Sequence, residues 1–168
     1  MKTLYLVRHA KSSWSKPQLA DFDRGLSKRG KRDAPLMGGR LAEHGVCPDL
    51  ILASPAKRAK KTAKIIAKAI GYPQKNIVFE RDIYSTSVKG LLRLLQKESN
   101  NNSFIFLVGH NHTITEFAEL LTGCRLDNLP TCGIVAITFP VSRWGNVKFG
   151  VGKLDFFDYP KKHLVKDR

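Results

Sequence analysis

The stretch Ser103-Phe104-Ile105-Phe106-Leu107-Val108-Gly109-His110 carries the clearest structural pattern in this 168-residue chain. Its run of apolar residues predicts a short strand that is buried on both faces, as in a parallel sheet. The strand ends at a glycine and a histidine, and a helix is expected to follow over residues 113–122. A strand that leads directly into a helix is typical of an α/β fold.

Other segments repeat this alternation of buried strands and helices. Strands are expected over residues 2–7, 50–53 and 76–80. Helices are expected over residues 27–44, 54–70 and a leucine-rich segment after Ser87, and β-rich stretches over 133–139 and 146–154. We therefore predict one α/β domain, residues 1–168: a three-layer sandwich with a mostly parallel central sheet and helices on both faces. The basic tail, residues 158–168, is expected to be frayed.

Three short signals set the expected helix ends. Ser27 can cap the first helix, whose C-terminus precedes Gly45. Pro35 lies inside that helix and predicts a kink or break near Ala34. Ser54-Pro55 combines a capping hydroxyl with a proline at the first helical position, which predicts a helix start there.

The composition limits which classes of binding partner and which cellular compartment are expected. The net charge is +15, and residues 24–68 hold twelve lysines and arginines against three acids. This excess indicates either an anionic partner or a solvated basic face. No apolar run is long enough for a membrane span or a signal peptide. The three cysteines, without zinc spacing, indicate reduced thiols in a cytoplasmic protein.

Cationic and imidazole side chains follow three of the predicted strands. Arg8 and His9 follow the first, Arg58 lies one turn beyond the Ser54-Pro55 segment, and His110 follows the Ser103–Val108 strand. The carboxyl ends of parallel strands form one edge, where ligands of α/β sheets bind. The guanidinium fork of arginine matches phosphate oxygens, and a neutral histidine can attack phosphorus. The sequence therefore predicts a site for a phosphate or another oxyanion.

The same segments resemble a known family over nearly the whole chain. Leu6-Val7-Arg8-His9-Ala10 resembles the Arg-His-Gly motif of the histidine phosphatase superfamily. Ser54-Pro55-Ala56-Lys57-Arg58-Ala59-Lys60-Lys61-Thr62 is similar to its Ser-Pro-x-x-Arg-Ala-x-x-Thr segment, and Val108-Gly109-His110 to its Gly-His segment. The resemblance narrows to the small SixA-type phosphohistidine phosphatases in the segments Arg8-His9-Ala10-Lys11-Ser12-Ser13-Trp14, Asp21-Phe22-Asp23-Arg24 and Leu26-Ser27-Lys28-Arg29-Gly30.

This resemblance implies a phosphoglycerate mutase-like fold and a set of roles. His9 would attack phosphorus and become phosphorylated, Arg8, Arg58 and His110 would hold the phosphoryl oxygens, and water would hydrolyse the intermediate. No metal or other cofactor would be required. Ser15 falls where many relatives place an asparagine that touches phosphate. Ala10 replaces the usual glycine, as in the SixA-like branch.

No acid occupies a clear position for protonating a leaving group. Asp21, Asp23, Glu80 and Asp82 are candidates by proximity alone, and ordinary loop carboxylates are the alternative. An imidazole, with a conjugate-acid pKa of roughly 6.5, leaves more easily than an alkoxide. The chain is also too short for the helical insertion that caps the site in larger relatives. We therefore hypothesise a phosphohistidine on a partner protein, such as a phosphotransfer domain, docked with help from the basic surface.

Three alternatives stay open at this point. The first is a broad phosphomonoesterase of the same superfamily. The second is a nucleic-acid-binding protein, which the net charge suggests but which no zinc-finger spacing or RNA-recognition motif supports. The third is a non-catalytic protein that binds phosphorylated partners. No membrane partner is expected.

Overall fold

The computed structural model describes residues 1–164, and its centre is a six-stranded sheet with the order β3-β2-β4-β1-β5-β6. The strands are β1 (Lys2–Arg8), β2 (Leu50–Ala53), β3 (Val78–Phe79), β4 (Phe104–Gly109), β5 (Ile134–Phe139) and β6 (Lys153–Asp158). β1 to β4 run parallel, and β5 is antiparallel to both of its neighbours. The mostly parallel sheet is thus confirmed.

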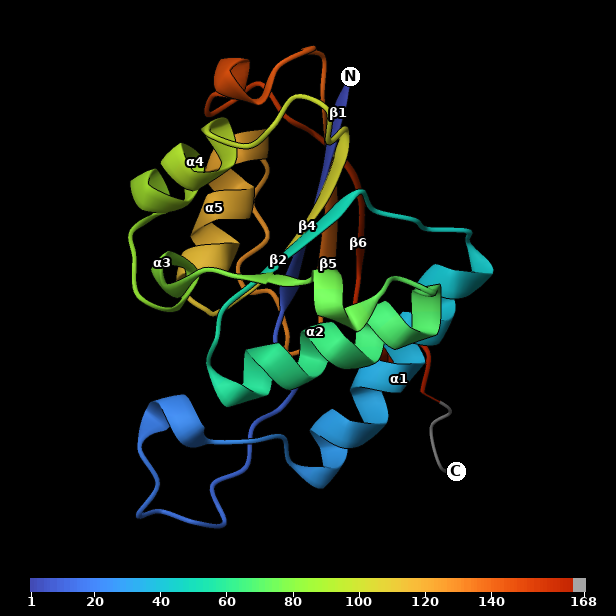
Figure 1. The fold of residues 1–168 in the computed structure, drawn as a ribbon, viewed down its shortest axis with the longest axis vertical. Helices are drawn as coiled ribbons and strands as arrows, with labels where there is room; N and C mark the ends of the chain where they lie inside the picture. Colours follow the sequence, from blue (N-terminus) through green and yellow to red (C-terminus); the bar gives the residue numbers. More distant parts are fainter. Residues whose placement is uncertain (165–168) are drawn as a thin grey trace.

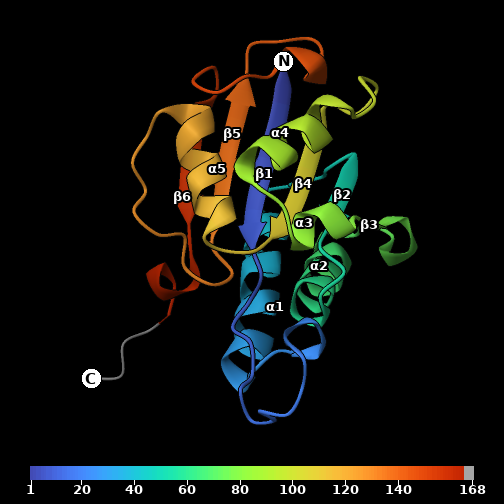
Figure 2. The ribbon, with the colours of Figure 1, turned by 90° about the vertical axis from the view of Figure 1, so that its left-hand side faces the viewer.

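Helices cover both faces of this sheet. Helices α1 (Lys28–Glu43) and α2 (Lys57–Ile70) pack on one face. Helices α3 (Arg81–Tyr84), α4 (Val88–Gln96) and α5 (Thr113–Thr122) pack on the other. Figures 1 and 2 show the sheet between these two groups of helices. The expected three-layer α/β sandwich is confirmed.

Strand β4 explains why the sequence pattern is so clear. Ile105 and Leu107 point into the core beneath α4 and α5, whereas Phe106 and Val108 point into the core beneath α1 and α2. All four residues are at most 1% exposed. Because successive side chains of a strand point to opposite faces, a strand between two cores must be apolar at every position.

Helix α1 has no break at Pro35 and α2 starts later than expected, whereas Ser27 does cap α1 and accepts a hydrogen bond from the Gly30 N–H. Helix α1 runs through Pro35 without a break. Because proline has no N–H, the carbonyl four residues before Pro35 lacks its helical hydrogen-bond donor. Pro35 is exposed, so water can donate to that carbonyl instead. Helix α2 begins at Lys57 rather than at Ser54, because Ala56 is still extended. The Ser54 hydroxyl accepts a hydrogen bond from the Ala56 N–H, 3.2 Å away.

The C-terminal β-rich stretch was also misplaced. Residues 147–152 do not join the sheet, since the Gly150 and Gly152 N–H groups donate to carbonyls at the end of α5. Gly150 has a φ of 82°, a left-handed conformation that lies outside the extended region of a strand. The expected strand at 76–80 shortens to β3, because residues 74–76 form a 3-10 turn.

The expected basic tail begins at the last residue of β6. Asp158 accepts hydrogen bonds from Arg40 and His163, and a 3-10 turn spans Pro160–Lys162. Residues 165–168 of that tail lie outside the described residues. Within residues 1–164, no helix is long and apolar enough to cross a membrane.

Candidate active site

The parallel strands β1, β2 and β4 end at one edge of the sheet, where a pocket of about 320 Å³ opens. The segment between β1 and α1 borders this edge, seen at the bottom of Figure 2. The pocket is lined by Arg8, His9, Lys11, Ser12, Trp14, Asp21, Arg24, Arg58, His110, Asn111 and Thr131. The structure thus brings the four principal predicted residues, Arg8, His9, Arg58 and His110, to one pocket.

His9 is held so that one ring nitrogen stays free. The residue is 7% exposed, its main-chain N–H donates to the Gly109 carbonyl, and its Nδ1 lies 2.7 Å from the Ala10 carbonyl oxygen. Because a carbonyl can only accept, Nδ1 carries the hydrogen and the lone pair is on Nε2. Burial lowers the pKa of His9 to about 3, against the opposing effect of the Ala10 hydrogen bond. The His9 imidazole is therefore neutral at neutral pH.

Helix α2 fixes the backbone next to His9. The Thr62 hydroxyl accepts a hydrogen bond from the Ala10 N–H at 3.0 Å and donates to the Arg58 carbonyl one turn earlier, at 2.8 Å. Thr62 is fully buried. The threonine at the end of the Ser-Pro-x-x-Arg-Ala-x-x-Thr segment thus joins α2 to the loop that carries the histidine.

His110 is oriented by the serine of the neighbouring strand end. Its Nε2 lies 2.7 Å from Oγ of the fully buried Ser54. Burial is the largest cause that lowers the pKa of His110 to about 4, and the positive charge of Arg58 acts in the same direction. The His9 and His110 ring centroids are 5.1 Å apart, so both neutral imidazoles border the same space.

Four buried nitrogens around the pocket have no hydrogen-bond partner among the described residues. They are His110 Nδ1 and the Nε atoms of Arg8, Arg24 and Arg58. Buried polar atoms are nearly always satisfied, so a cluster of unsatisfied ones around a pocket indicates a ligand. Guanidinium donors favour oxyanions, and charge-assisted hydrogen bonds to phosphate are among the strongest in proteins.

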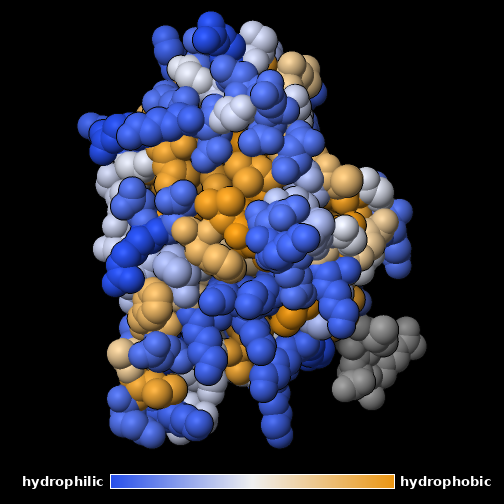
Figure 3. Space-filling model, in the orientation of Figure 1, coloured by the Kyte–Doolittle hydropathy of each residue, from blue (hydrophilic) through white to orange (hydrophobic). Residues whose placement is uncertain are grey.

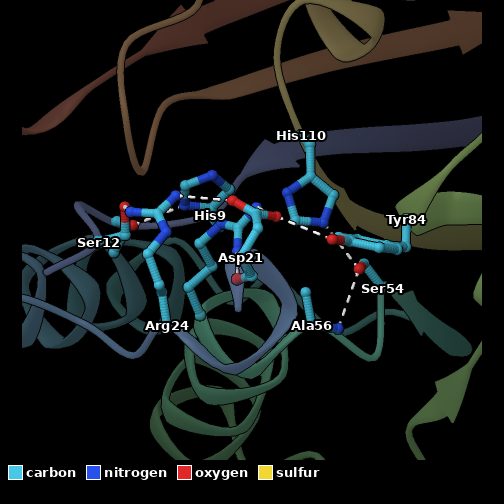
Figure 4. A network of polar contacts seen from close by, with 10 residues as sticks. His9, Ser12, Asp21, Arg24, Ser54, Ala56, Tyr84 and His110 are labelled. Carbon is cyan, nitrogen blue, oxygen red and sulfur yellow. Dashed lines mark hydrogen bonds and ion pairs between the residues drawn. The ribbon is translucent and has the colours of Figure 1, made fainter. Parts of the chain in front are cut away.

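A carboxylate already occupies part of this cationic site. Asp21 accepts hydrogen bonds from Arg58 at 2.9 Å, Arg24 at 3.0 Å and the Tyr84 hydroxyl at 2.9 Å, as Figure 4 shows in part. Partial burial raises the pKa of Asp21, but these three hydrogen bonds outweigh it and hold the pKa well below its usual value. Asp21 is therefore ionised at neutral pH and is paired with Arg58 and Arg24.

The other predicted residues lie elsewhere. Ser15 is exposed, bonds to Ser13 and borders a separate hollow. Glu80, Asp82 and Asp23 do not line the pocket, although the Glu80 N–H donates to the Ala53 carbonyl at the end of β2. Among the described residues that line the pocket, Asp21 is the sole carboxylate.

Three residues of the site were not assigned a role from sequence. Arg24 donates to Ser12 and stacks on Trp14, with 3.5 Å between its guanidinium carbon and the ring centroid. Arg24 lies in a segment that resembles the SixA-type proteins, so the sequence did contain a signal for a role of this residue in the site. Ser54 was interpreted only as a helix cap. Tyr84 had no signal, because the short helix α3 that carries it was not expected.

The fold and the pocket define a class: α/β proteins that gather two histidines and several arginines around one pocket. Residues 4–84 match the family model of the histidine phosphatase superfamily, branch 1. An uncharacterised chloroplastic protein of Arabidopsis thaliana is 34% identical over 151 residues, covering 85% of this chain and 69% of the plant protein. The chain belongs to the histidine phosphatase superfamily.

Solved structures narrow the similarity within that superfamily. A provisionally assigned phosphohistidine phosphatase SixA from Agrobacterium tumefaciens superposes with a TM-score of 0.79 at 28% identity, covering 95% of this chain and 98% of that one. The protein histidine phosphatase SixA complexed with tungstate has a TM-score of 0.82 at 19% identity, with 95% and 98% coverage. The expected phosphoglycerate mutase-like fold and the similarity to the SixA branch are thus confirmed.

Proposed function

We propose that this protein is a phosphatase that removes the phosphoryl group from phosphohistidine on a partner protein, through a phosphorylated His9. The observation that carries the proposal is the pairing of a free His9 Nε2 with four unsatisfied buried nitrogens around one pocket. A nucleophile and a ready-made oxyanion site are the two parts that phosphoryl transfer needs most.

In the first proposed step, the Nε2 lone pair of His9 attacks phosphorus. The bond between phosphorus and the imidazole nitrogen of the substrate breaks, and its electron pair returns to that imidazole, which takes a proton from solvent. Arg8 and Arg58 hold the equatorial oxygens with charge-assisted hydrogen bonds, and His110 donates through Nδ1 when Ser54 donates to its Nε2. The positive charge comes from guanidinium groups, so these steps require no metal.

In the second proposed step, water hydrolyses the intermediate. A water oxygen attacks phosphorus, the bond from phosphorus to Nε2 of His9 breaks, and the electron pair returns to the ring. The water proton passes to solvent, and inorganic phosphate leaves. The Ala10 carbonyl keeps its bond to Nδ1–H throughout, so His9 returns to the same tautomer.

The ionised carboxylate in the pocket favours a phosphohistidine substrate over a phosphate ester. Asp21 is held ionised by two arginines and therefore cannot donate a proton to an alkoxide in this arrangement. An imidazole leaving group has a conjugate-acid pKa of roughly 6.5, so solvent can supply its proton at neutral pH. The similarity to the SixA proteins supports the same substrate class.

Substrate preference tests this proposal. The purified enzyme is expected to dephosphorylate a histidine-phosphorylated phosphotransfer domain with a kcat/KM at least 100-fold above that for para-nitrophenyl phosphate, with or without a metal chelator. A higher kcat/KM for the ester would instead support a broad phosphomonoesterase. Loss of activity in chelator that a divalent metal restores would overturn the metal-independent mechanism.

A further inference from the structure

Two hollows on the face formed by α1 and α2 share a lining residue, so we treat them as one basic groove. The first borders the segment between β1 and α1, the second runs along α2, and Lys61 lines both. We call this the lysine groove and define it by Lys16, Lys31, Lys57, Lys61, Lys64 and Lys68. None of the residues that line either hollow is an acid.

The charges of the lysine groove are not neutralised within the chain. Among the described residues, every ion pair uses an arginine or a histidine as its cation, and none uses a lysine of the groove. Five of the six lysines are exposed, and Lys64 is half-buried. In Figure 3 hydrophilic side chains dominate the surface around α2, with small hydrophobic areas between them. Such a concentration of one charge attracts an anionic partner.

The lysine groove begins beside the active site. Lys57 immediately precedes Arg58 in the chain, and its side chain lies against Gly25, where an added Cβ would be 3.6 Å from its Cε. From Lys57 to Lys68 the helix rises about 16 Å at 1.5 Å per residue. A partner that presents a group to His9 could therefore continue along about three turns of α2.

The lining of the groove favours a protein over a single-stranded nucleic acid. Its neutral lining residues include the aliphatic side chains of Leu19, Leu26 and Ile65, and no aromatic side chain lines either hollow. Single-stranded nucleic acids are held largely by stacking of bases on aromatic rings, which this lining does not offer. Aliphatic residues between lysines instead match a protein surface that combines acidic and apolar side chains.

We propose that the lysine groove docks an acidic, partly apolar surface next to the phosphohistidine of the partner protein. This inference rests on the proposed function and adds the place where the partner binds. The groove then contributes to KM for a phosphoprotein, and it contributes nothing for a small substrate that fills only the pocket. Complementary charge also accelerates association, so KM for the phosphoprotein is expected to rise with salt.

The test compares two charge-reversed enzymes with equal net charge. The groove variant carries Lys61→Glu, Lys64→Glu and Lys68→Glu, all outside the pocket around His9. The matched control carries Lys89→Glu, Lys97→Glu and Lys148→Glu, three exposed lysines outside the groove. Circular dichroism verifies that both variants fold. The substrates are a histidine-phosphorylated phosphotransfer domain with an acidic surface and the small molecule phosphoramidate.

The groove variant is expected to raise KM for the phosphoprotein at least tenfold and to flatten its salt dependence, with kcat/KM for phosphoramidate unchanged within twofold. The control is expected to change kcat/KM for neither substrate by more than twofold.

Equal effects of the two variants, or no effect of the groove variant, would overturn the docking site alone. Groove-dependent binding of single-stranded DNA with an unchanged phosphoprotein KM would assign the groove to nucleic acid instead. A wild-type enzyme inactive on both substrates would overturn the proposed function as well.

Discussion

At His9, one hydrogen bond decides which ring nitrogen carries the lone pair. The Ala10 carbonyl accepts from Nδ1, which leaves Nε2 free for the proposed covalent step, and burial keeps the ring neutral by lowering its pKa to about 3. Arg58 is likewise held by contacts to neighbouring groups. Its guanidinium contacts the Asp21 carbonyl and carboxylate, while its buried Nε has no partner among the described residues.

Substituting Arg58 by lysine tests whether the shape of the cation matters. Arg58→Lys keeps the charge but replaces a planar fork by a point charge. We expect kcat to fall by about 100-fold or more, since single oxyanion donors contribute on that scale. The measurement is steady-state kinetics on phosphoramidate, with Arg40→Lys, on the far end of α1, as control. A kcat within threefold of wild type would show that charge alone suffices at this position.

At the scale of elements, α2 connects the arginine to the histidine through Thr62. The Thr62→Val variant keeps the shape and leaves the buried Ala10 N–H without an acceptor. An unsatisfied buried donor costs about 1–3 kcal/mol, so the free energy of unfolding should fall by that amount. Since Ala10 follows His9, kcat should fall too. Urea denaturation measures the free energy of unfolding and steady-state kinetics measures kcat. The Thr62→Ser variant, which keeps the hydroxyl, should restore both quantities toward the wild-type values. Unchanged kinetics in a destabilised Thr62→Val enzyme would limit Thr62 to stability.

The elements also show what could be predicted from sequence. Strand β4 was clear because all its side chains enter a core, and Arg8, His9, Arg58 and His110 could be grouped because parallel strands end at one edge. Their chemical roles remain predictions. The segment 147–152 was mistaken for a strand because its hydrogen bonds go to the distant end of α5. Tyr84 and Asp21 meet 63 residues apart in sequence, and no local pattern encodes such a contact.

At the scale of the whole molecule, the two buried histidines link stability to pH. In the folded protein the pKa values of His9 and His110 are about 3 and about 4, whereas an unfolded histidine titrates near 6.5. Below pH 6.5 the unfolded chain therefore binds more protons than the folded one. Stability is fully present above that pH and is lost as the pH falls toward 4 and 3.

The wild-type free energy of unfolding is expected to decrease from pH 7 to pH 4. Each buried neutral histidine contributes a slope of about 1.4 kcal/mol per pH unit well below its unfolded pKa. Replacing His110 by asparagine removes one of these groups, so the slope should become smaller by about that amount. Urea denaturation at several pH values measures it, and exposed His44→Asn is the control. Identical slopes for the wild type and the His110→Asn variant would contradict the burial of a neutral ring.

The proposed mechanism is tested most directly by the identity of the phosphorylated atom. A radiolabelled histidine-phosphorylated protein is mixed with enzyme, quenched in base within milliseconds, and the label is located by peptide mapping and by NMR of the phosphorylated ring. The proposed mechanism predicts phosphohistidine at Nε2 of His9, and neither label nor turnover in the His9→Ala enzyme. Label on another residue or on Nδ1, or turnover that survives in His9→Ala, would contradict it.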